Sequence, residues 1–306
     1  MEIGEAIEEM KKIRVKRVFV QLPEGLKTKS LEIADLLEKN GLDVVICIEN
    51  TYGACDLRDE EALRLGCDAI LHLGHNDFGF EKMKSNLPIF YIELFSERDG
   101  RDGYQMMLDV LKNFKKIGVV YSIQYKMAFE NVVKFLRENE KEVFYDKNGQ
   151  IIGCNLLSAL NVENKVDAFL VVSSGNFHAF GLALKTQKPV FVFDAELGEI
   201  RKIEIKKYLK ILEWNKKIFE ESRKVGLLVS WKKGQIKDFK SIKDRIEKLG
   251  KKVYVLSFDE LNENLLEGLK LDCLVNLACP RICVEDAGRY KMPIVCFNVL
   301  LQTEKF

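Results

Sequence analysis

The sequence has few histidines and prolines, almost no net charge and no long apolar run. Three His and 5 Pro occur among 306 residues, and 48 Lys plus Arg face 47 Asp plus Glu, a formal net charge of +1. This balance argues against a protein that coats nucleic acid or an anionic membrane. No apolar run approaches the ~18 residues that indicate a membrane-spanning helix. We therefore expect no membrane anchoring and no direct binding to nucleic acid.

Targeting segments and flexible linkers are also missing. The first residues, MEIGEAIEEMKKIRVKR, lack the apolar core and cleavage site of a signal peptide. No segment is of low complexity, and none is a Gly/Ser-rich linker. We expect a cytoplasmic protein, in which the 8 Cys stay reduced rather than forming a disulfide framework. The 47% of hydrophobic residues is enough for a buried core.

Short apolar runs alternate with helical stretches, which is typical of parallel α/β domains. Continuous apolar runs suit strands that are buried on both faces of a sheet. The expected strands fall into three groups of four: 17–21, 44–48, 69–73 and 89–92; 117–121, 143–145, 168–172 and 190–193; 225–230, 253–256, 273–277 and 294–297.

An Asp and a Pro recur at matching places in the three groups. The residues before the third strands are Asp68, Asp167 and Asp272, and those before the fourth strands are Pro88, Pro189 and Pro293. This period of about 100 residues predicts three similar domains instead of the two that length alone suggests. We predict domains 1–98, 99–210 and 211–306. Each would be a four-stranded parallel sheet flanked by helices, and the three would surround a pseudo-threefold axis.

Strand position divides the cysteines, because parallel sheets bind ligands outside the carboxyl ends of their strands. Residues inside or before expected strands are interpreted as core residues: Cys47, Cys67, Cys273 and Cys296. Residues in loops that follow strands are candidate ligands: Cys55, Cys154, Cys279 and Cys283. Three thiolates, one from each domain, suit a 4Fe–4S cluster with one open iron. A closed zinc site would instead need a fourth ligand, Cys283 or a His.

Several segments resemble one known family, the archaeal 2-(3-amino-3-carboxypropyl)histidine synthases of the first step of diphthamide synthesis. They are QLPEGL at 21–26, YGACD at 52–56, GCN at 153–155, SSGNFHAFG at 173–181 and ACPRICVEDA at 278–287. KKGQ at 232–235 is similar to a further family loop. The resemblance runs through essentially the whole chain.

The resemblance implies an iron–sulfur radical enzyme whose 4Fe–4S ligands here are Cys55, Cys154 and Cys279, with Cys283 outside the set. It implies that S-adenosylmethionine binds the open iron and is cleaved between sulfur and the methionine γ-carbon. The 3-amino-3-carboxypropyl radical then adds to the imidazole C2 of a His in translation elongation factor 2, and methylthioadenosine is released. A homodimer and an electron donor are further implied partners.

A sulfonium cosubstrate with a carboxylate needs polar partners at the same sheet edges. The candidates are Gln21, Glu24, His75, Asn176, His178, Gln235 and Arg281, and a turn close to the adenosine is expected from Pro23 and Gly25. Purely structural roles stay open: a solvated turn for Glu24, loop orientation for His75, a helix cap for His178, and a surface pair with Glu285 or Asp286 for Arg281. His72 lies within an expected strand and is interpreted as core.

Two other functions fit the same residues. One is a condensing and dehydrating iron–sulfur enzyme like quinolinate synthase, which also takes one cluster cysteine from each of three domains. The other is a zinc-stabilised binding module without catalysis, although zinc ligands usually come as close pairs. Metal content and cleavage of S-adenosylmethionine would separate these three functions.

Overall fold

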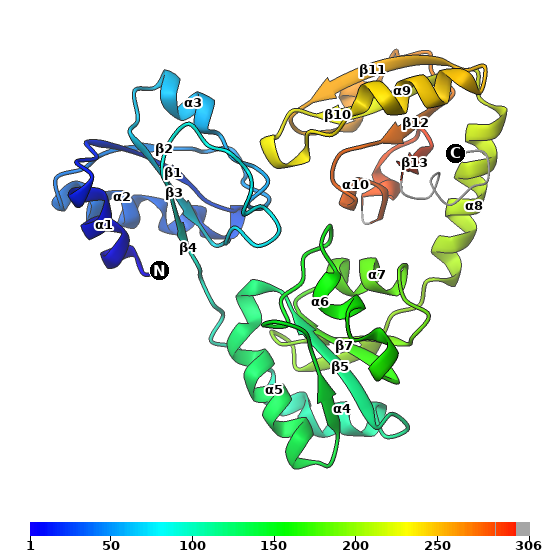
Figure 1. Cartoon of the computed structure of the whole chain (residues 1–306), viewed down its shortest axis with the longest axis horizontal. Coiled ribbons are helices and arrows are strands. Elements are labelled where there is room, and N and C mark those ends of the chain that lie inside the picture. The colour runs from blue at the N-terminus through cyan, green and yellow to red at the C-terminus, as the bar shows by residue number, and fades with distance from the viewer. Residues whose placement is uncertain (285, 298–306) are drawn as a thin grey trace. The chain divides into compact units, whose positions relative to one another are not determined.

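The structure is a computed structural model that describes residues 1–284 and 286–297. Glu285 and the end of the third predicted domain, residues 298–306, lie outside the described residues. Three sheets follow one another along the chain, each flanked by helices (Figure 1). The strand orders are β2-β1-β3-β4, β6-β5-β7-β8-β9 and β11-β10-β12-β13. The predicted α/β class with three similar sheets is therefore confirmed.

The chain separates into two compact units. Unit 1 is Met1–Ser96 together with Lys232–Gly234, and unit 2 is Glu97–Trp231 together with Gln235–Phe306. Unit 1 holds the first sheet, and unit 2 holds the second and third sheets. The predicted boundaries of three separate domains stay a prediction.

The first sheet is entirely parallel. Apolar side chains cover both of its faces, as the continuous apolar strands predict. Its strands are β1 (Arg17–Gln21), β2 (Asp43–Ile46), β3 (Ala69–Leu73) and β4 (Ile89–Ile92). The helices of this segment are α1 (Ile3–Lys12), α2 (Ser30–Lys39) and α3 (Asp59–Arg64).

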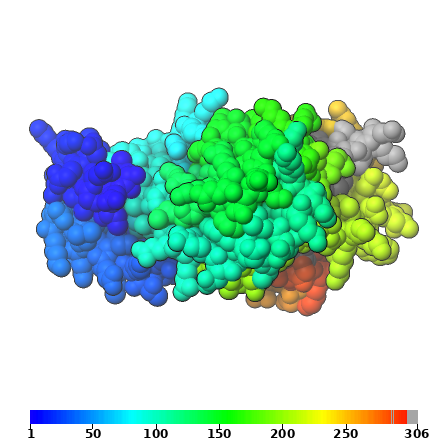
Figure 2. All heavy atoms as spheres, turned by 90° about the horizontal axis from the view of Figure 1, so that it is seen from below, coloured from blue at the N-terminus to red at the C-terminus, as the bar shows by residue number. Residues whose placement is uncertain are grey.

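The second sheet has five strands rather than the four predicted, and the fifth is antiparallel. Its strands are β5 (Lys116–Tyr121), β6 (Glu142–Phe144), β7 (Ala168–Ser173), β8 (Val190–Asp194) and β9 (Glu199–Lys202). The helices are α4 (Tyr104–Val110), α5 (Lys126–Glu138), α6 (Leu157–Leu160) and α7 (Phe177–Ala183). Figure 2 shows atoms of this segment, in green, on the face turned to the viewer.

Asp194 organises the turn that joins β8 to β9. Its Oδ1 accepts hydrogen bonds from the backbone N–H groups of Glu196 and Leu197 at 3.1 and 3.3 Å. The chain therefore reverses within a few residues and pairs β9 with β8. The sequence-based prediction missed β9 because its residues, EIRK, lack a continuous apolar run.

The third sheet is parallel throughout. Its strands are β10 (Lys224–Ser230), β11 (Lys252–Phe258), β12 (Cys273–Asn276) and β13 (Ile294–Cys296). The helices are α8 (Lys206–Glu221), α9 (Phe239–Lys248) and α10 (Arg281–Val284). No helix among the described residues is long and apolar enough to cross a membrane.

The repeated Asp and Pro have the same structural role in each sheet. Asp68 Oδ2 accepts hydrogen bonds from the backbone N–H groups of Lys16 and Arg17, at 2.8 and 2.9 Å, just where β1 begins. The matching carboxylates bind the residues that begin β5 and β10 in the same way: Asp167 to Lys115 and Lys116, Asp272 to Arg223 and Lys224. Each Pro carbonyl accepts a bond from the third strand: Pro88 from Ile70, Pro189 from Phe169, Pro293 from Leu274. The repeat of Asp and Pro in the sequence therefore reflects one set of hydrogen bonds, present in each sheet, that joins the third strand to its neighbours.

Replacing Asp68, Asp167 or Asp272 with Asn should lower the free energy of unfolding by about 1 kcal/mol or less each, because water screens these exposed bonds. The backbone N–H groups hold the pKa of all three carboxyls below the ordinary value. Their stabilisation is thus complete above about pH 4 and is lost as the pH falls through the folded-state pKa. In urea denaturation, the difference from the parent chain should shrink between pH 7 and pH 2. An undiminished difference at pH 2 would contradict this role.

Candidate metal and cosubstrate site

The Cys55 loop, residues 51–58, follows β2 in unit 1 and is held by Gln21. This residue ends β1 and is fully buried, and its Nε2 donates to the backbone carbonyl of Asp56 at 2.9 Å. Its Oε1 accepts the backbone N–H of Arg58 at 3.1 Å. Both ends of the amide therefore engage the loop that carries the half-buried Cys55. Gln21, predicted to bind the cosubstrate, lies where it positions this loop.

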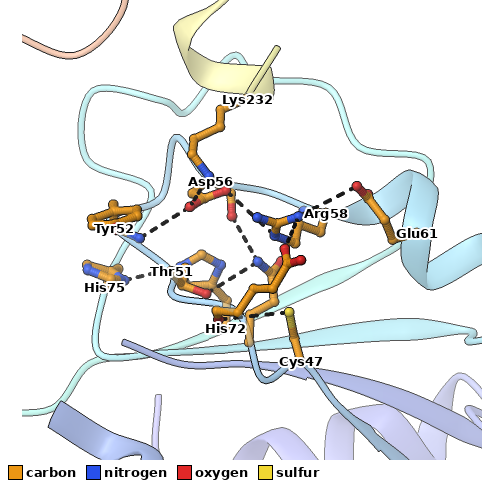
Figure 3. Close-up of polar contacts among 11 residues, drawn as sticks. Cys47, Thr51, Tyr52, Asp56, Arg58, Glu61, His72, His75 and Lys232 are labelled. Atoms are coloured by element: carbon orange, nitrogen blue, oxygen red, sulfur yellow. Dashed lines mark hydrogen bonds and ion pairs between the residues drawn. The ribbon is translucent and has the colours of Figure 1, made fainter. Parts of the chain in front are cut away.

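Asp56, next to Cys55 in the chain, forms a buried ion pair with Lys232. The Nζ of Lys232 lies 2.8 Å from Oδ2 of Asp56, and the two residues are 6% and 1% exposed. Arg58 Nε is 3.9 Å from the other carboxylate oxygen, and Figure 3 shows both cations approaching Asp56. Burial raises the pKa of Asp56, and Lys232 and Arg58 oppose that rise. This ion pair attaches a segment of the KKGQ motif to the Cys55 loop.

Two further contacts bind the same segment within unit 1. Lys233 Nζ lies 2.6 Å from Oδ2 of Asp59, which is itself buried. The backbone N–H of Gly234 donates to the carbonyl of Cys55 at 2.8 Å. A Cβ on Gly234 would lie only 2.5 Å from the Cα of Cys55, so this approach requires glycine. Residues 232–234 are thus part of the surroundings of Cys55.

His75 follows β3 and is half-buried, and its Nδ1 lies 3.2 Å from Nε2 of His72. Burial lowers the pKa of His72 to about 3 and the pKa of His75 to about 4. Both rings are therefore neutral at pH 7. The interpretation of His72 as a core residue is confirmed by its complete burial, but the sequence did not reveal its hydrogen bond to His75.

The remaining unit 1 candidates form the turn after β1. Pro23 precedes the 3₁₀ helix Glu24–Lys29 and packs beside Gly74, so the loops after β1 and β3 are in contact. Glu24 is exposed and pairs with Lys27 at 2.6 Å, consistent with the solvated turn that the sequence left open. Gly25 has open space where a side chain would be.

Cys154 lies exposed at the tip of a tight turn in unit 2. Ile152 and Asn155, on either side of the turn, exchange two backbone hydrogen bonds of 3.0 Å. A Cβ on Gly153 would lie 2.3 Å from the ring of Phe177. Glycine therefore allows the turn to pack directly on the start of α7, which explains the GCN segment.

Cys279 follows β12 in a loop that Asn276 organises. The Nδ2 of Asn276 donates to the backbone carbonyl of Cys279 at 2.9 Å, and its Oδ1 accepts the N–H of Ala278 at 3.0 Å. Burial raises the pKa of Cys279 to about 11, and the nearby Cys154 thiol raises it further. Two of the three predicted ligands are therefore neighbours within unit 2. A buried amide supports the cysteine loop here, as Gln21 does in unit 1.

Three predicted cosubstrate residues lie around the start of α7. The guanidinium of Arg281 lies 5.9 Å from the ring centre of Phe177. His178 is the second residue of α7, and burial, together with Arg281, lowers its pKa to about 4. Asn176 precedes the helix, and its Oδ1 accepts a hydrogen bond from Nε of Arg201 at 3.0 Å. The start of α7 thus gathers polar groups beside the Cys154 turn.

The surface ion pair and the helix cap that the sequence left open for Arg281 and His178 differ in outcome. Arg281 Nε lies 3.8 Å from Asp286, a pair between an exposed arginine and a half-buried carboxylate, and Glu285 lies outside the described residues. Gln235 ends a short 3₁₀ turn after β10 and is half-buried. His178 makes no helix-capping hydrogen bond that the structure describes.

Of the four cysteines interpreted as core residues, Cys47, Cys67 and Cys273 are buried, whereas Cys296 is half-buried. Cys283, which the sequence left among the candidate ligands, is also buried. Cys283 accepts a hydrogen bond from Nδ2 of Asn276 at 3.3 Å. Burial raises its pKa well above the ordinary value, and the neighbouring Cys296 raises it further. Cys283 is therefore packed into the third sheet's core.

The sequence missed the residues that hold the cysteine loops. Asp56 and Lys232 stand in the YGACD and KKGQ segments, but the sequence does not indicate that they pair across 176 positions. Asn276 ends a strand, and nothing in its neighbourhood marks it as a loop organiser. Among residues 1–284 and 286–297, no three His, Cys, Asp or Glu side chains form a ready metal-binding group. Thiols are nevertheless the donors that iron–sulfur centres use.

The fold and these loops define a class: a multi-sheet α/β protein with thiols and polar side chains on loops after its parallel strands. A family model described as "Putative diphthamide synthesis protein" matches residues 22–300. The chain therefore belongs to the diphthamide synthesis family, which confirms the resemblance seen in the sequence.

Curated relatives and solved structures agree with this assignment. The chain is 30% identical to the 2-(3-amino-3-carboxypropyl)histidine synthase of Pyrococcus horikoshii, over 95% of this chain and 86% of that protein. It is 29% identical to the synthase of the same name from Methanocaldococcus jannaschii, over 94% of this chain and 84% of that protein. The crystal structure of Dph2 from P. horikoshii with a 4Fe-4S cluster matches with a TM-score of 0.88 and 30% identity, covering 99% and 92% of the two chains. The two curated relatives thus carry the same synthase name.

Proposed function

We propose that this chain is an S-adenosylmethionine-dependent transferase that adds a 3-amino-3-carboxypropyl group to the imidazole C2 of a His in translation elongation factor 2. The observation that carries the proposal is the match of nearly the whole chain to synthases named for that product. The reaction would be the first step of diphthamide synthesis and would release methylthioadenosine.

Cys55, Cys154 and Cys279 are the proposed ligands of a 4Fe–4S cluster. Each lies on a loop near the carboxyl end of a parallel strand, and each of the three sheets supplies one. The proximity of Cys154 and Cys279, and the 4Fe-4S cluster in the similar Dph2, support this set. When bound, such a cluster supplies an electron and an open iron for the cosubstrate. Cys283 stays outside the set because it is buried and accepts a bond from Asn276.

The protein's own residues would bind and orient S-adenosylmethionine. In unit 1, His75 offers a ring nitrogen, and the turn of Pro23, Glu24 and Gly25 offers backbone close to the loop after β3. The proposed unit 2 contacts are Asn176, His178, Gln235 and Arg281. Gln21 would act indirectly: its side-chain amide would hold the loop that carries Cys55 in position.

The remaining parts of the proposal concern assembly and location. We take the protein to be a cytoplasmic homodimer that receives electrons from a separate donor. Domains 1–98, 99–210 and 211–306 would each contribute one cluster ligand.

Anaerobic reconstitution with iron and sulfide, followed by S-adenosylmethionine, dithionite and elongation factor 2, tests the function. We expect a 4Fe–4S chromophore, methylthioadenosine release, and one added 3-amino-3-carboxypropyl group on the factor by mass spectrometry. A factor with its target His replaced is the control and should gain no mass. Turnover of a dicarboxylate imine without cleavage of S-adenosylmethionine, or bound zinc without iron, would overturn the proposal.

A further inference from the structure

Three side chains stand in a row across the carboxyl edge of the first sheet. Gln21 of β1 is the register partner of His72 in β3, and His72 is the register partner of Tyr91 in β4. Side chains alternate along a strand, so His72 shares a sheet face with Ile70, two residues earlier. Ile70 belongs to the same buried apolar cluster as Leu57 of the Cys55 loop. His72 therefore lies on the same face of the sheet as that loop.

His72 has a single hydrogen-bonding partner in the described structure. Its Nε2 lies 3.2 Å from Nδ1 of His75, and Figure 3 shows the two rings joined by this contact. Its other nitrogen, Nδ1, is buried and has no hydrogen-bond partner. The ring of Tyr91 packs at 5.1 Å between centres, which fills the space beside His72 with an aromatic ring.

This arrangement decides which nitrogen carries the shared proton. If Nδ1 of His75 donated to His72, the proton of neutral His72 would lie on its own Nδ1, a buried donor without an acceptor. Buried N–H donors without partners are rare and strongly unfavourable. If His72 donates from Nε2 instead, its buried Nδ1 carries a lone pair and no proton. No buried N–H group of His72 is then left without an acceptor. His75 then accepts at Nδ1 and carries its proton on Nε2.

We infer that His72 is a positioning residue that fixes His75 as a neutral imidazole whose Nε2–H donates a hydrogen bond to a carboxylate or hydroxyl oxygen. That the acceptor belongs to S-adenosylmethionine rests on the proposed function. The lowered pKa values of both rings agree with the neutral state. His75 would thus bind and orient the cosubstrate as a donor, and it would not act as a base.

Nitrogen NMR of the ¹⁵N-histidine-labelled full chain tests the proton positions before any cosubstrate is added. The chain has only 3 His, so the variants His72→Phe and His75→Gln assign every ring. We expect a slowly exchanging proton on Nε2 of His72, coupled across the hydrogen bond to an unprotonated Nδ1 of His75. A proton on Nδ1 of His75, or no coupling between the rings, would overturn the inference.

Cosubstrate kinetics test the role of the donor. His72→Phe removes the bond and should raise the KM for S-adenosylmethionine about tenfold with a smaller change in kcat, the size expected for one oriented hydrogen bond. His72→Gln keeps an N–H donor for Nδ1 of His75 and should stay within about threefold of the parent chain. Equal KM values for both variants would overturn the role of the donor. If the parent chain does not cleave S-adenosylmethionine, the proposed function fails, while the NMR result still decides the proton positions.

Discussion

Changing Cys55, Cys154 or Cys279 to Ser, one at a time, is expected to abolish the 4Fe–4S chromophore. It should also lower methylthioadenosine release at least about a hundredfold, because losing a ligand exceeds the effect of losing a residue that only supports one. Each change leaves the loop backbone in place, since Gln21 and Asn276 hold the loops through backbone atoms and not through the thiols of Cys55 and Cys279. Iron and sulfide analysis and the absorption spectrum after anaerobic reconstitution measure the outcome.

Cys283→Ala and Cys296→Ala are the matched controls. Cys283 lies four residues after Cys279, and both controls remove a thiol from the third sheet. Each should retain the chromophore, with a loss of stability typical of a small buried truncation, about 1–3 kcal/mol for Cys283. Full loss of iron in the Cys283 variant, with iron kept in the Cys279 variant, would move the third ligand to Cys283.

Lys232→Met is expected to destabilise the Cys55 loop by about 3 kcal/mol, the low end for breaking a buried ion pair, because the buried carboxylate of Asp56 loses its closest cation and keeps only Arg58 at 3.9 Å. The pKa of Asp56 is already raised by burial and would rise further without the lysine. A raised pKa means that the folded state is favoured at low pH and loses this advantage as the pH rises through the folded-state value. The defect should therefore be largest near pH 7.5 and shrink toward pH 5. Hydrogen exchange of residues 51–58 measures it locally.

Two comparison variants separate charge from lost packing. Lys233→Met breaks a pair whose lysine is partly exposed, and Asp59 keeps the backbone N–H of Asn86 at 2.7 Å, closer than the 3.3 Å bond from Tyr52 that Asp56 keeps, so we expect a loss of about 1 kcal/mol. The double change of Lys232→Met with Asp56→Asn removes both charges and should recover much of the stability. A double variant as unstable as Lys232→Met alone would show that the buried charge is not the cause.

The sequence predicted features that depend on neighbouring residues. Strands were recognisable because continuous apolar runs suit central parallel strands. The Asp and Pro that precede the third and fourth strands recurred because each sheet begins its strands with the same backbone hydrogen bonds. The middle sheet's fifth strand was missed because EIRK has no such run, and the turn that leads into it is held by the carboxylate of Asp194.

For the cysteines, position relative to the strands predicts burial better than it predicts which residues hold their loops. Position relative to strands placed Cys47, Cys67, Cys273 and Cys296 in the core, and the first three are buried whereas Cys296 is half-buried. Position alone did not reveal that the loop of Cys279 is organised by Asn276, although it did predict that the thiols of Cys154 and Cys279 come together. The role of Asn276 depends on how the loop folds back on the end of its strand, and sequence spacing does not encode that contact.

The sequence by itself determined the family, the three α/β sheets and the cysteines that follow strands. These follow from strand patterns, from a spacing that repeats along the chain and from matched segments, and none of them requires knowing which side chains are in contact. Only the tertiary structure decided that Lys232 pairs with Asp56, that Gly234 lies against Cys55 and that His72 orients His75. The physical reason is that a buried charge or ring nitrogen takes its partner from whichever side chains the packed fold brings within hydrogen-bonding distance.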